Sequence, residues 1–463
     1  MTRTADSSDK FLRMTRSPVE PLICRLAVPT IISCLVMTFY NVADTYFIGK
    51  INTSASAAVG VSFSLMAVIQ AIGFFFGQGS GNNISRELGK QHGHEAEILA
   101  SVGFFSALIA GAVITVTGLL LLEPLAEMLG STETILPYST AYMRLILIGA
   151  PWMTASFVLN NQLRFEGSAF YGMIGLVSGA VLNITLDPLL IFTFDMGISG
   201  AALATIISQF VGFTLLFCGC RFAGNVPIRL RNFRPSFQVY RMIANGGTPS
   251  LCRQGIACIA VICLNTAAKP FGDAAIAAMA IVSRITHFTN FALIGFGQGF
   301  QPVCGFNYGA RLYDRVRRAF WFCVKVTAVF LLVLSVVEFI AAPWLIELFR
   351  KGDPEVTRIG SVALRLQCLT FPLAAWVTIS NMMLQTTGKM FRASFLGLAR
   401  QGVFLIPFVL LLPPVIGVLG VQAAQPVADL ISFAISIPLQ CSLLREMRRE
   451  EATFSIGRER ENS

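Results

Sequence analysis

Apolar stretches alternate with short polar segments along almost the whole chain. Each stretch is at least as long as the roughly 20 helical residues that cross about 30 Å of hydrocarbon. The pattern therefore predicts an all-α, polytopic membrane protein with twelve transmembrane helices. The expected spans lie near residues 24–49, 55–84, 96–121, 136–163, 169–194, 197–220, 243–269, 273–304, 317–343, 357–385, 391–414 and 417–442.

The composition supports this interpretation. Of the 463 residues, 54% are hydrophobic and only 13% are charged, whereas a soluble domain carries about 25% charged residues. The lipid bilayer is therefore the expected surrounding. The net charge of +10 does not indicate a nucleic-acid partner, because the basic residues fall in loops. The polar segment 1–20 has no apolar signal core, and we expect no cleaved signal.

Lysine and arginine are concentrated in alternate loops and at both ends of the chain. By the positive-inside rule these segments face the cytoplasm. We therefore expect a multi-pass protein of the cytoplasmic (inner) membrane with both termini cytoplasmic, which requires an even number of spans. The basic segments are 13–25, 86–90, 221–241, 311–318, 389–392 and 445–449.

The two halves of the sequence repeat. Pro29 and Pro249 are 220 residues apart, and Phe-Gly-Gln-Gly occurs at 76–79 and again at 296–299. Other identities keep this offset within one residue. The repeat predicts two six-helix lobes, residues 1–235 and 236–463, which share one orientation. Such lobes are related by a pseudo-two-fold axis along the membrane normal and leave a cleft between them.

Acidic side chains inside the apolar stretches are the candidate functional groups, because a charge in the membrane is costly. Asp44 lies roughly 9 Å and Asp187 roughly 12 Å inside the outer face, counting about 1.5 Å per helical residue. Asn183 is one turn deeper than Asp187, and Thr205 lies roughly 12 Å inside on the next span. These oxygens suit a coupling cation. The pattern leaves open whether it is Na⁺ or a shared proton.

The spans of the second half hold Arg253, Arg284, Arg400 and Asp429. All four fall near the bilayer middle when depth is counted from their span ends. We expect Asp429 to pair with Arg400 or Arg284 and so hold helices together.

The chain resembles the multidrug and toxin extrusion (MATE) family of transporters, over about residues 20–445. The twelve spans in two six-helix repeats carry part of this resemblance. The motifs that carry the rest are Pro29 with Asn41-Val-Ala-Asp-Thr45, Asn183-Ile-Thr-Leu-Asp-Pro188, Gly197-Ile-Ser-Gly-Ala-Ala-Leu-Ala-Thr205 and the glycine-rich segment Gly295–Gly309.

The resemblance implies an efflux antiporter that couples inward flow of H⁺ or Na⁺ to export of amphiphilic, often cationic, compounds. It implies that Asp44 and Asp187 are the acids of the first lobe and that Asn183 and Thr205 are their polar companions. It also implies that Pro29 bends the first span, where a proline alone fits a static kink equally well. Some family members carry Na⁺-binding acids in spans 7 and 10. This chain has none in 243–269 or 357–385, so coupling is expected in the first lobe.

Two other functions remain open at this stage. A flippase for a lipid-linked saccharide or another polar lipid would use positive groups to meet phosphates. Arg253, Arg284 and Arg400 would serve it if they line the cleft unpaired. A membrane-embedded enzyme has less support. The sequence shows no Ser/His/Asp set, metal-ligand spacing or phosphate loop, and Gly73–Gly81 and Gly295–Gly309 indicate close helix packing. We expect a monomer without cofactor that handles small amphiphilic or cationic substrates.

Overall fold

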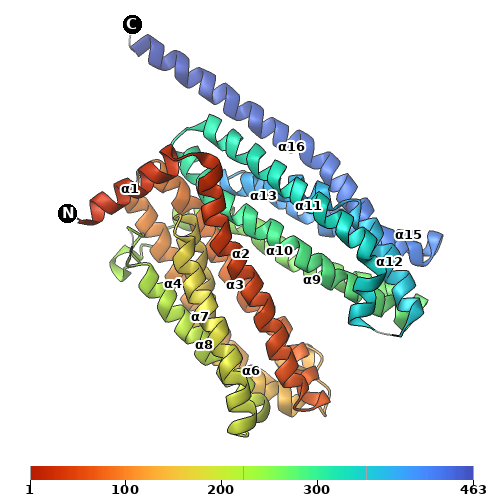
Figure 1. Ribbon diagram of the computed structural model, residues 1–463. Coiled ribbons are helices and arrows are strands. Elements are labelled where there is room, and N and C mark those ends of the chain that lie inside the picture. The colour runs from red at the N-terminus through yellow and green to blue at the C-terminus, as the bar shows by residue number, and fades with distance from the viewer. Residues whose placement is uncertain (1, 223, 351, 462–463) are drawn as a thin grey trace. The chain divides into compact units, whose positions relative to one another are not determined.

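A computed structural model of the protein describes residues 2–222, 224–350 and 352–461, and every element in these ranges is helical (Figure 1). The elements in chain order are α1 (Thr2–Arg16), α2 (Val19–Gly49), α3 (Thr53–Gly89), α4 (Gly93–Leu120), α5 (Leu122–Met128), α6 (Leu136–Phe165), α7 (Ala169–Pro188), η1 (Leu189–Thr193), α8 (Gly197–Gly219), η2 (Leu230–Asn232), α9 (Phe237–Ala268), η3 (Lys269–Phe271), α10 (Asp273–Gly309), α11 (Tyr313–Phe349), α12 (Pro354–Cys368), α13 (Phe371–Thr386), α14 (Met390–Leu398), η4 (Ala399–Phe404), α15 (Leu405–Ile416) and α16 (Val418–Glu461).

The prediction of twelve spans is confirmed. Eleven helices of the described chain are long and apolar enough to cross a membrane, and α12 with α13 forms the twelfth span. This pair is bent by 54°. Pro372, in the first turn of α13, explains the break, because its ring clashes with the carbonyl of Cys368, the last residue of α12. Hydropathy indicated the length of this span but not its bend.

The described chain forms two compact units, one of residues up to Ser17 and 25–247, the other of residues 18–24 and 248 onward. The units divide at 247/248, whereas the sequence suggested 235/236. The reason is that the first turns of α9 pack on α3. The amide of Asn83 donates to the carbonyl of Met242 over 2.8 Å, and a Cβ on Gly247 would lie 2.2 Å from the carbonyl oxygen of Phe75.

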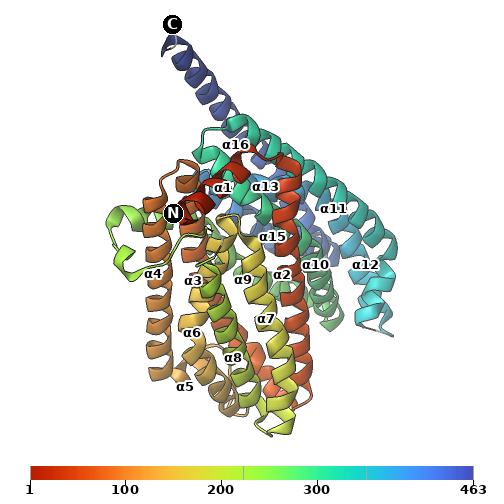
Figure 2. The same ribbon diagram turned by 60° about the vertical axis from the view of Figure 1, so that its left-hand side comes forward.

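Within the first unit, α6 packs against α3, α4 and α8. Glycines of α3 let it approach α6 closely, since a Cβ on Gly73 would lie 2.6 Å from Phe157 and one on Gly81 would lie 2.2 Å from Phe165. The glycine-rich segment Gly73–Gly81 is thus a packing surface, as its sequence indicated. Figure 2 shows α7 and α8 of the same unit lying side by side.

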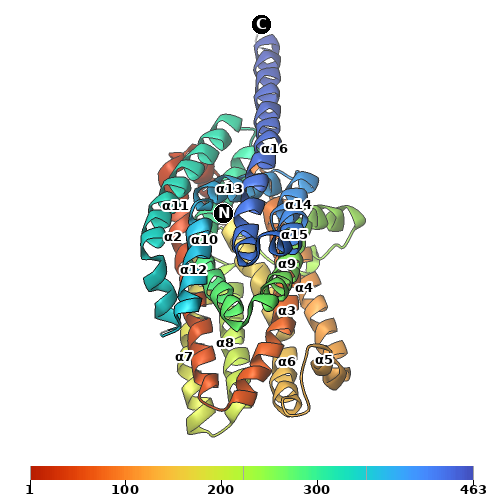
Figure 3. The same ribbon diagram turned by 90° about the vertical axis from the view of Figure 1, so that its right-hand side faces the viewer.

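In the second unit, α16 packs against α13, α15 and η4, and Figure 3 shows it continuing toward the C-terminus as one long helix. The repeat also reappears in the hydrogen bonds of each unit. The amide of Asn160 donates to the carbonyl of Gly172 over 3.3 Å, and that of Asn381 donates to the carbonyl of Ala393 over 2.7 Å. Left-handed backbone recurs at the same offset within one residue, in the pairs Gln91 and Arg311, Gly167 and Gly388, and Gly197 and Gly417.

The N-terminal helix α1 is anchored on the first unit by a buried lysine. Lys10 Nζ donates to Asn225 Oδ1 over 2.5 Å and lies 3.7 Å from Glu166 Oε2, which accepts from the backbone N–H of Val226 over 2.9 Å. Burial opposes both charges and outweighs their mutual attraction. It lowers the pKa of Lys10 to about 8 and raises the pKa of Glu166 to about 7.

These shifts predict a minimum in the contribution of the pair to stability between about pH 7 and pH 8. The folded chain holds more protons on Glu166 than the unfolded chain between pH 4.5 and about 7, so stability falls as pH rises there. Lys10 holds fewer protons in the folded chain between about pH 8 and 10.5, so stability rises with pH there.

We expect the melting temperature of the wild type, relative to a Lys10→Met/Glu166→Gln variant, to be lowest near pH 7.5. The relative stability should increase toward pH 6 and toward pH 9 by up to about 1.4 kcal/mol per pH unit. Thermal unfolding of both proteins in detergent over this range measures the difference. A difference that stays constant from pH 6 to pH 9 would contradict this account of the buried pair.

Candidate functional site

Asp187 lies at a local break in a membrane span. It is the last residue of α7 before Pro188, and a π-helical turn, η1, follows directly. Proline has no N–H, so the regular hydrogen bond to the carbonyl of Ile184 is lost. Wide turns of this kind occur often at functional sites. The side chain of Asp187 is fully buried at this break.

Asn183 connects Asp187 with α8. In the orientation of its amide that satisfies both ends, Nδ2 donates to Asp187 Oδ2 over 2.9 Å and Oδ1 accepts from the backbone N–H of Thr205 over 3.2 Å. The opposite orientation leaves only a 3.3 Å contact from Nδ2 to Thr205 Oγ1. The first orientation is therefore favoured, and it joins three of the four predicted residues.

Asp44 of α2 is the fourth, and it is buried with the other three. Its charge acts on that of Asp187, which places the two carboxyl groups within electrostatic range of each other. In each of them Oδ1 is buried without a hydrogen-bond partner in the described structure. An unsatisfied buried acceptor is costly. The site therefore has two oxygens able to receive a proton or a cation.

Two tyrosines complete the site, and sequence reasoning missed both. Tyr40 and Tyr142 are buried, lie beside the Thr205 hydroxyl, and interact electrostatically with Asp44 and Asp187. Tyr40 could have been found, since it precedes Asp44 by one helical turn and shares its face. Nothing in the sequence distinguishes Tyr142 from other aromatic residues of its span.

Gly200 of α8 determines how closely η1 can approach. A Cβ at this position would lie 2.7 Å from the carbonyl oxygen of Leu190 and 3.0 Å from the nitrogen of Ile191. Both atoms belong to the backbone just beyond Asp187, so they cannot move aside independently of the carboxylate. The glycine thus positions Asp187 against Thr205.

We expect Gly200→Ala to reduce transport at least tenfold, because the added methyl group displaces η1 and with it Asp187. Gly60→Ala is the matched control, since a Cβ on Gly60 meets no heavy atom within 4 Å. Initial rates of export by both variants at equal protein amounts measure the effect. Equal rates for the two variants would show that the spacing of η1 and α8 is not critical.

Pro29 lies within α2, which continues through it as a helix. The carbonyl of Pro29 accepts a hydrogen bond from the Ser33 hydroxyl over 2.9 Å. A proline there removes the backbone bond to the carbonyl of Arg25. The missing backbone bond marks where α2 would bend, and bending at Pro29 stays a prediction.

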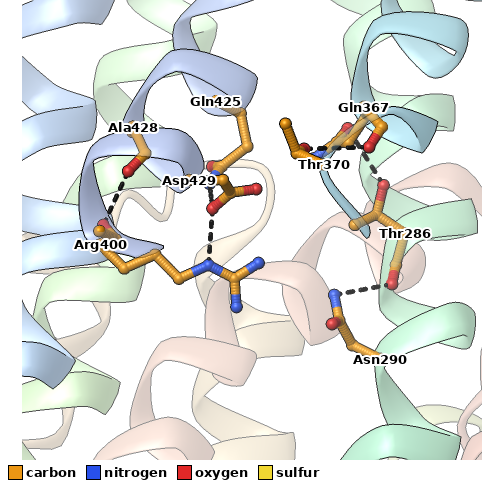
Figure 4. A network of polar contacts seen from close by, with 9 residues as sticks. Thr286, Asn290, Gln367, Thr370, Arg400, Gln425, Ala428 and Asp429 are labelled. Carbon is orange, nitrogen blue, oxygen red and sulfur yellow. Dashed lines mark hydrogen bonds and ion pairs between the residues drawn. The ribbon is translucent and has the colours of Figure 1, made fainter. Parts of the chain in front are cut away.

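Two of the four charged residues predicted near the bilayer middle in the second half form an ion pair (Figure 4). Arg400, in the π-helical turn η4, donates from Nε to Asp429 Oδ1 over 2.7 Å, and Gln425 Nε2 donates to the same oxygen over 3.0 Å. Of the two arginines expected as partners of Asp429, Arg400 makes the contact. Arg284 is exposed and, like Arg253, makes no ion pair with any residue that the structure describes.

Comparisons with known proteins agree along the length of the chain. The MatE family model matches residues 29–189 and 257–411. Multidrug export protein MepA of Staphylococcus saprophyticus is 27% identical over 435 residues, which cover 93% of this chain and 95% of that protein.

Solved structures are similar over nearly the whole fold. A crystal structure of MATE in complex with MaL6 has a TM-score of 0.89 and 26% identity, and the match covers 95% of this chain and 99% of that one. A multidrug resistance MATE family transporter in an outward-facing conformation has a TM-score of 0.88 and 26% identity, over 94% of this chain and 98% of that one.

Proposed function

Because the chain belongs to the MatE family, we propose that it is a multidrug efflux antiporter. In this proposal, entry of H⁺ or Na⁺ drives export of amphiphilic, often cationic, compounds across the cell membrane by alternating access. The names of the MepA relative and of the similar outward-facing transporter support multidrug export. Both termini are proposed to face the cytoplasm, on the distribution of basic residues.

One observation carries the coupling mechanism: two carboxyl groups, Asp44 and Asp187, are buried together, each with an oxygen that lacks a partner among the described residues. Two neighbouring buried carboxylates cannot both be ionised at low energetic cost. A proton or a cation that enters from outside neutralises part of this charge. A cationic substrate held by the same charge is then released, either directly or through bending of α2 at Pro29.

Na⁺ and H⁺ make different demands on the site. Na⁺ requires several hard oxygen ligands. The candidate ligands are the unpaired Oδ1 atoms of Asp44 and Asp187, the Asn183 Oδ1 and the Thr205 hydroxyl. A proton requires only one carboxylate oxygen. Oxygen ligands of these types suit either ion, so the choice between them belongs to experiment.

Purified protein in liposomes, with either a pH gradient or a Na⁺ gradient imposed, tests the proposal. We expect one gradient to drive movement of a fluorescent cationic dye and the other to have no effect. Movement that is equal with and without either gradient would overturn ion coupling.

The alternative of a polar-lipid flippase has less support. Arginines that meet lipid phosphates need to be free of acidic partners, and Arg400 is paired with Asp429. Only Arg253 and Arg284 of the three candidates keep this alternative open. Transfer of a fluorescent lipid between leaflets without any dye export would favour it.

A further inference from the structure

A cavity adjoins the carboxylate site and runs between α7 and α8. Tyr40, Asn183 and Thr205 line one end of it, and Leu216 lines the other. These two ends are about 16 Å apart, since Thr205 and Leu216 are eleven residues apart on one helix. Because α8 ends at Gly219, the cavity extends from the site toward the membrane face at that end of α8.

An unpaired hydroxyl group lies partway along this cavity. Ser208 lines it, is only 2% exposed, and its Oγ has no hydrogen-bond partner within the described chain. Serines inside helices usually donate to the carbonyl four residues earlier, as Ser62 does here over 2.8 Å. The hydroxyl of Ser208 is therefore available to bind water in the cavity.

Other polar side chains also line the cavity. Gln209 lines the cavity next to Ser208, and Ser156 of α6 contributes a third side chain. The Ser156 hydroxyl donates to the carbonyl of Trp152 over 2.7 Å, which leaves its lone pairs free to accept a hydrogen bond from water. A buried water typically needs two to four polar partners. The cavity has about 20 Å³ of space for water, which is room for about one molecule, and the polar side chains of its lining supply partners for it: Asn183, Thr205, Ser208, Gln209 and Ser156.

The far end of the cavity is closed by apolar packing. Leu216 is fully buried, and a Cβ on Gly175 of α7 would lie 2.5 Å from its Cγ. Beside it the two helices touch through glycines, since a Cβ on Gly212 would lie 3.0 Å from the carbonyl oxygen of Gly175. Leu216 thus lies at the apolar end of a cavity that is otherwise lined by several polar side chains.

We propose that this cavity is the exit path of the coupling ion. A water molecule bound at Ser208 is the first group that solvates the departing ion, and Leu216 is the barrier at the inner end of the path. The ion leaves Asp187, Asn183 and Thr205 along α8 instead of returning past Asp44. Ser208 is a positioning residue in this path: it holds the water that solvates a proton or a cation. This assignment of direction depends on the proposed antiport function, whereas the presence of water in the cavity does not.

Radiolytic labelling of the purified full-length protein tests the water directly, because hydroxyl radicals formed from bound water oxidise the side chains beside it. We expect Tyr40 to be labelled although it is only 6% exposed, and Met143, fully buried outside the cavity, to remain unlabelled. Ser208→Val should reduce the labelling of Tyr40 at least threefold by filling the cavity. Ser208→Ala, which removes only the hydroxyl, should reduce it about twofold.

Ser62→Val is the matched control, because Ser62 is equally buried and its hydroxyl is satisfied within its own helix. It should leave the labelling of Tyr40 unchanged. Labelling of Tyr40 that is the same in the wild type and in both Ser208 variants would overturn the proposal. The Ser208→Ala variant keeps the test valid if the larger side chain prevents folding.

Transport in liposomes then separates this proposal from the function on which it rests. We expect Ser208→Val to lower gradient-driven dye export at least tenfold and Leu216→Ala to raise the leak of the coupling ion several-fold without dye. If the wild type exports dye and both variants export it at the same rate without extra leak, the exit path would be overturned, but the antiport function would not. Failure of the wild type to respond to any gradient would overturn the antiport function, while the labelling result would still decide whether the cavity holds water.

Discussion

Asp44→Asn is expected to lower gradient-driven export at least about 100-fold while the protein remains folded. Asparagine has nearly the shape of aspartate, so the packing around this buried position is retained. What is lost is the charge that must alternate between the coupling ion and the substrate. Asp187 would then ionise without the repulsion of a second carboxylate near it.

Efflux of a fluorescent cation from cells that produce equal amounts of each variant measures this effect. Asp195→Asn is the matched control, because Asp195 is exposed in the connection between η1 and α8 and takes no part in the site. The control should export at the wild-type rate. Efflux by Asp44→Asn at the rate of this control would refute the role assigned to Asp44.

The features of this molecule that could be predicted from sequence are those that a lipid environment imposes on the sequence. Apolar stretches must be long enough to cross the bilayer, so the spans follow from hydropathy. Asp44 and Asp187 stand out because a carboxylate within such a stretch is energetically costly and usually marks a functional site. The repeat could be read because glycines and prolines with special backbone roles keep their offset, as Gly167 and Gly388 do.

The parts that were missed depend on how helices face one another. Tyr142 reaches the site because α6 packs against α8, and the apolar pattern of a span does not encode such a neighbour. The first turns of α9 belong with the first unit because Gly246 and Gly247 fit against α3, a contact that composition cannot reveal. Lys10 lies in a polar segment outside the predicted spans, for which the sequence indicated no partner, yet it forms a buried link with Glu166.

Arg400→Met is expected to destabilise the second unit strongly. Asp429 is nearly fully buried and receives its charged hydrogen bond from Arg400. Removing one partner of a buried ion pair costs about 3–5 kcal/mol, because the other charge is left uncompensated. For a unit of this size the loss corresponds to a fall in melting temperature of roughly 6–20 °C.

The double variant Arg400→Met/Asp429→Asn should recover most of this loss. It removes both charges together, and the asparagine keeps a hydrogen bond with Gln425, which donates to Asp429 in the wild type. Melting temperatures of the wild type, the single variant and the double variant form the measurement. If the pair is structural, dye export should return with stability in the double variant. Restored stability with export still lost would instead assign Arg400 or Asp429 a direct role in handling the substrate, and the charges of the second unit would then belong to the transport mechanism.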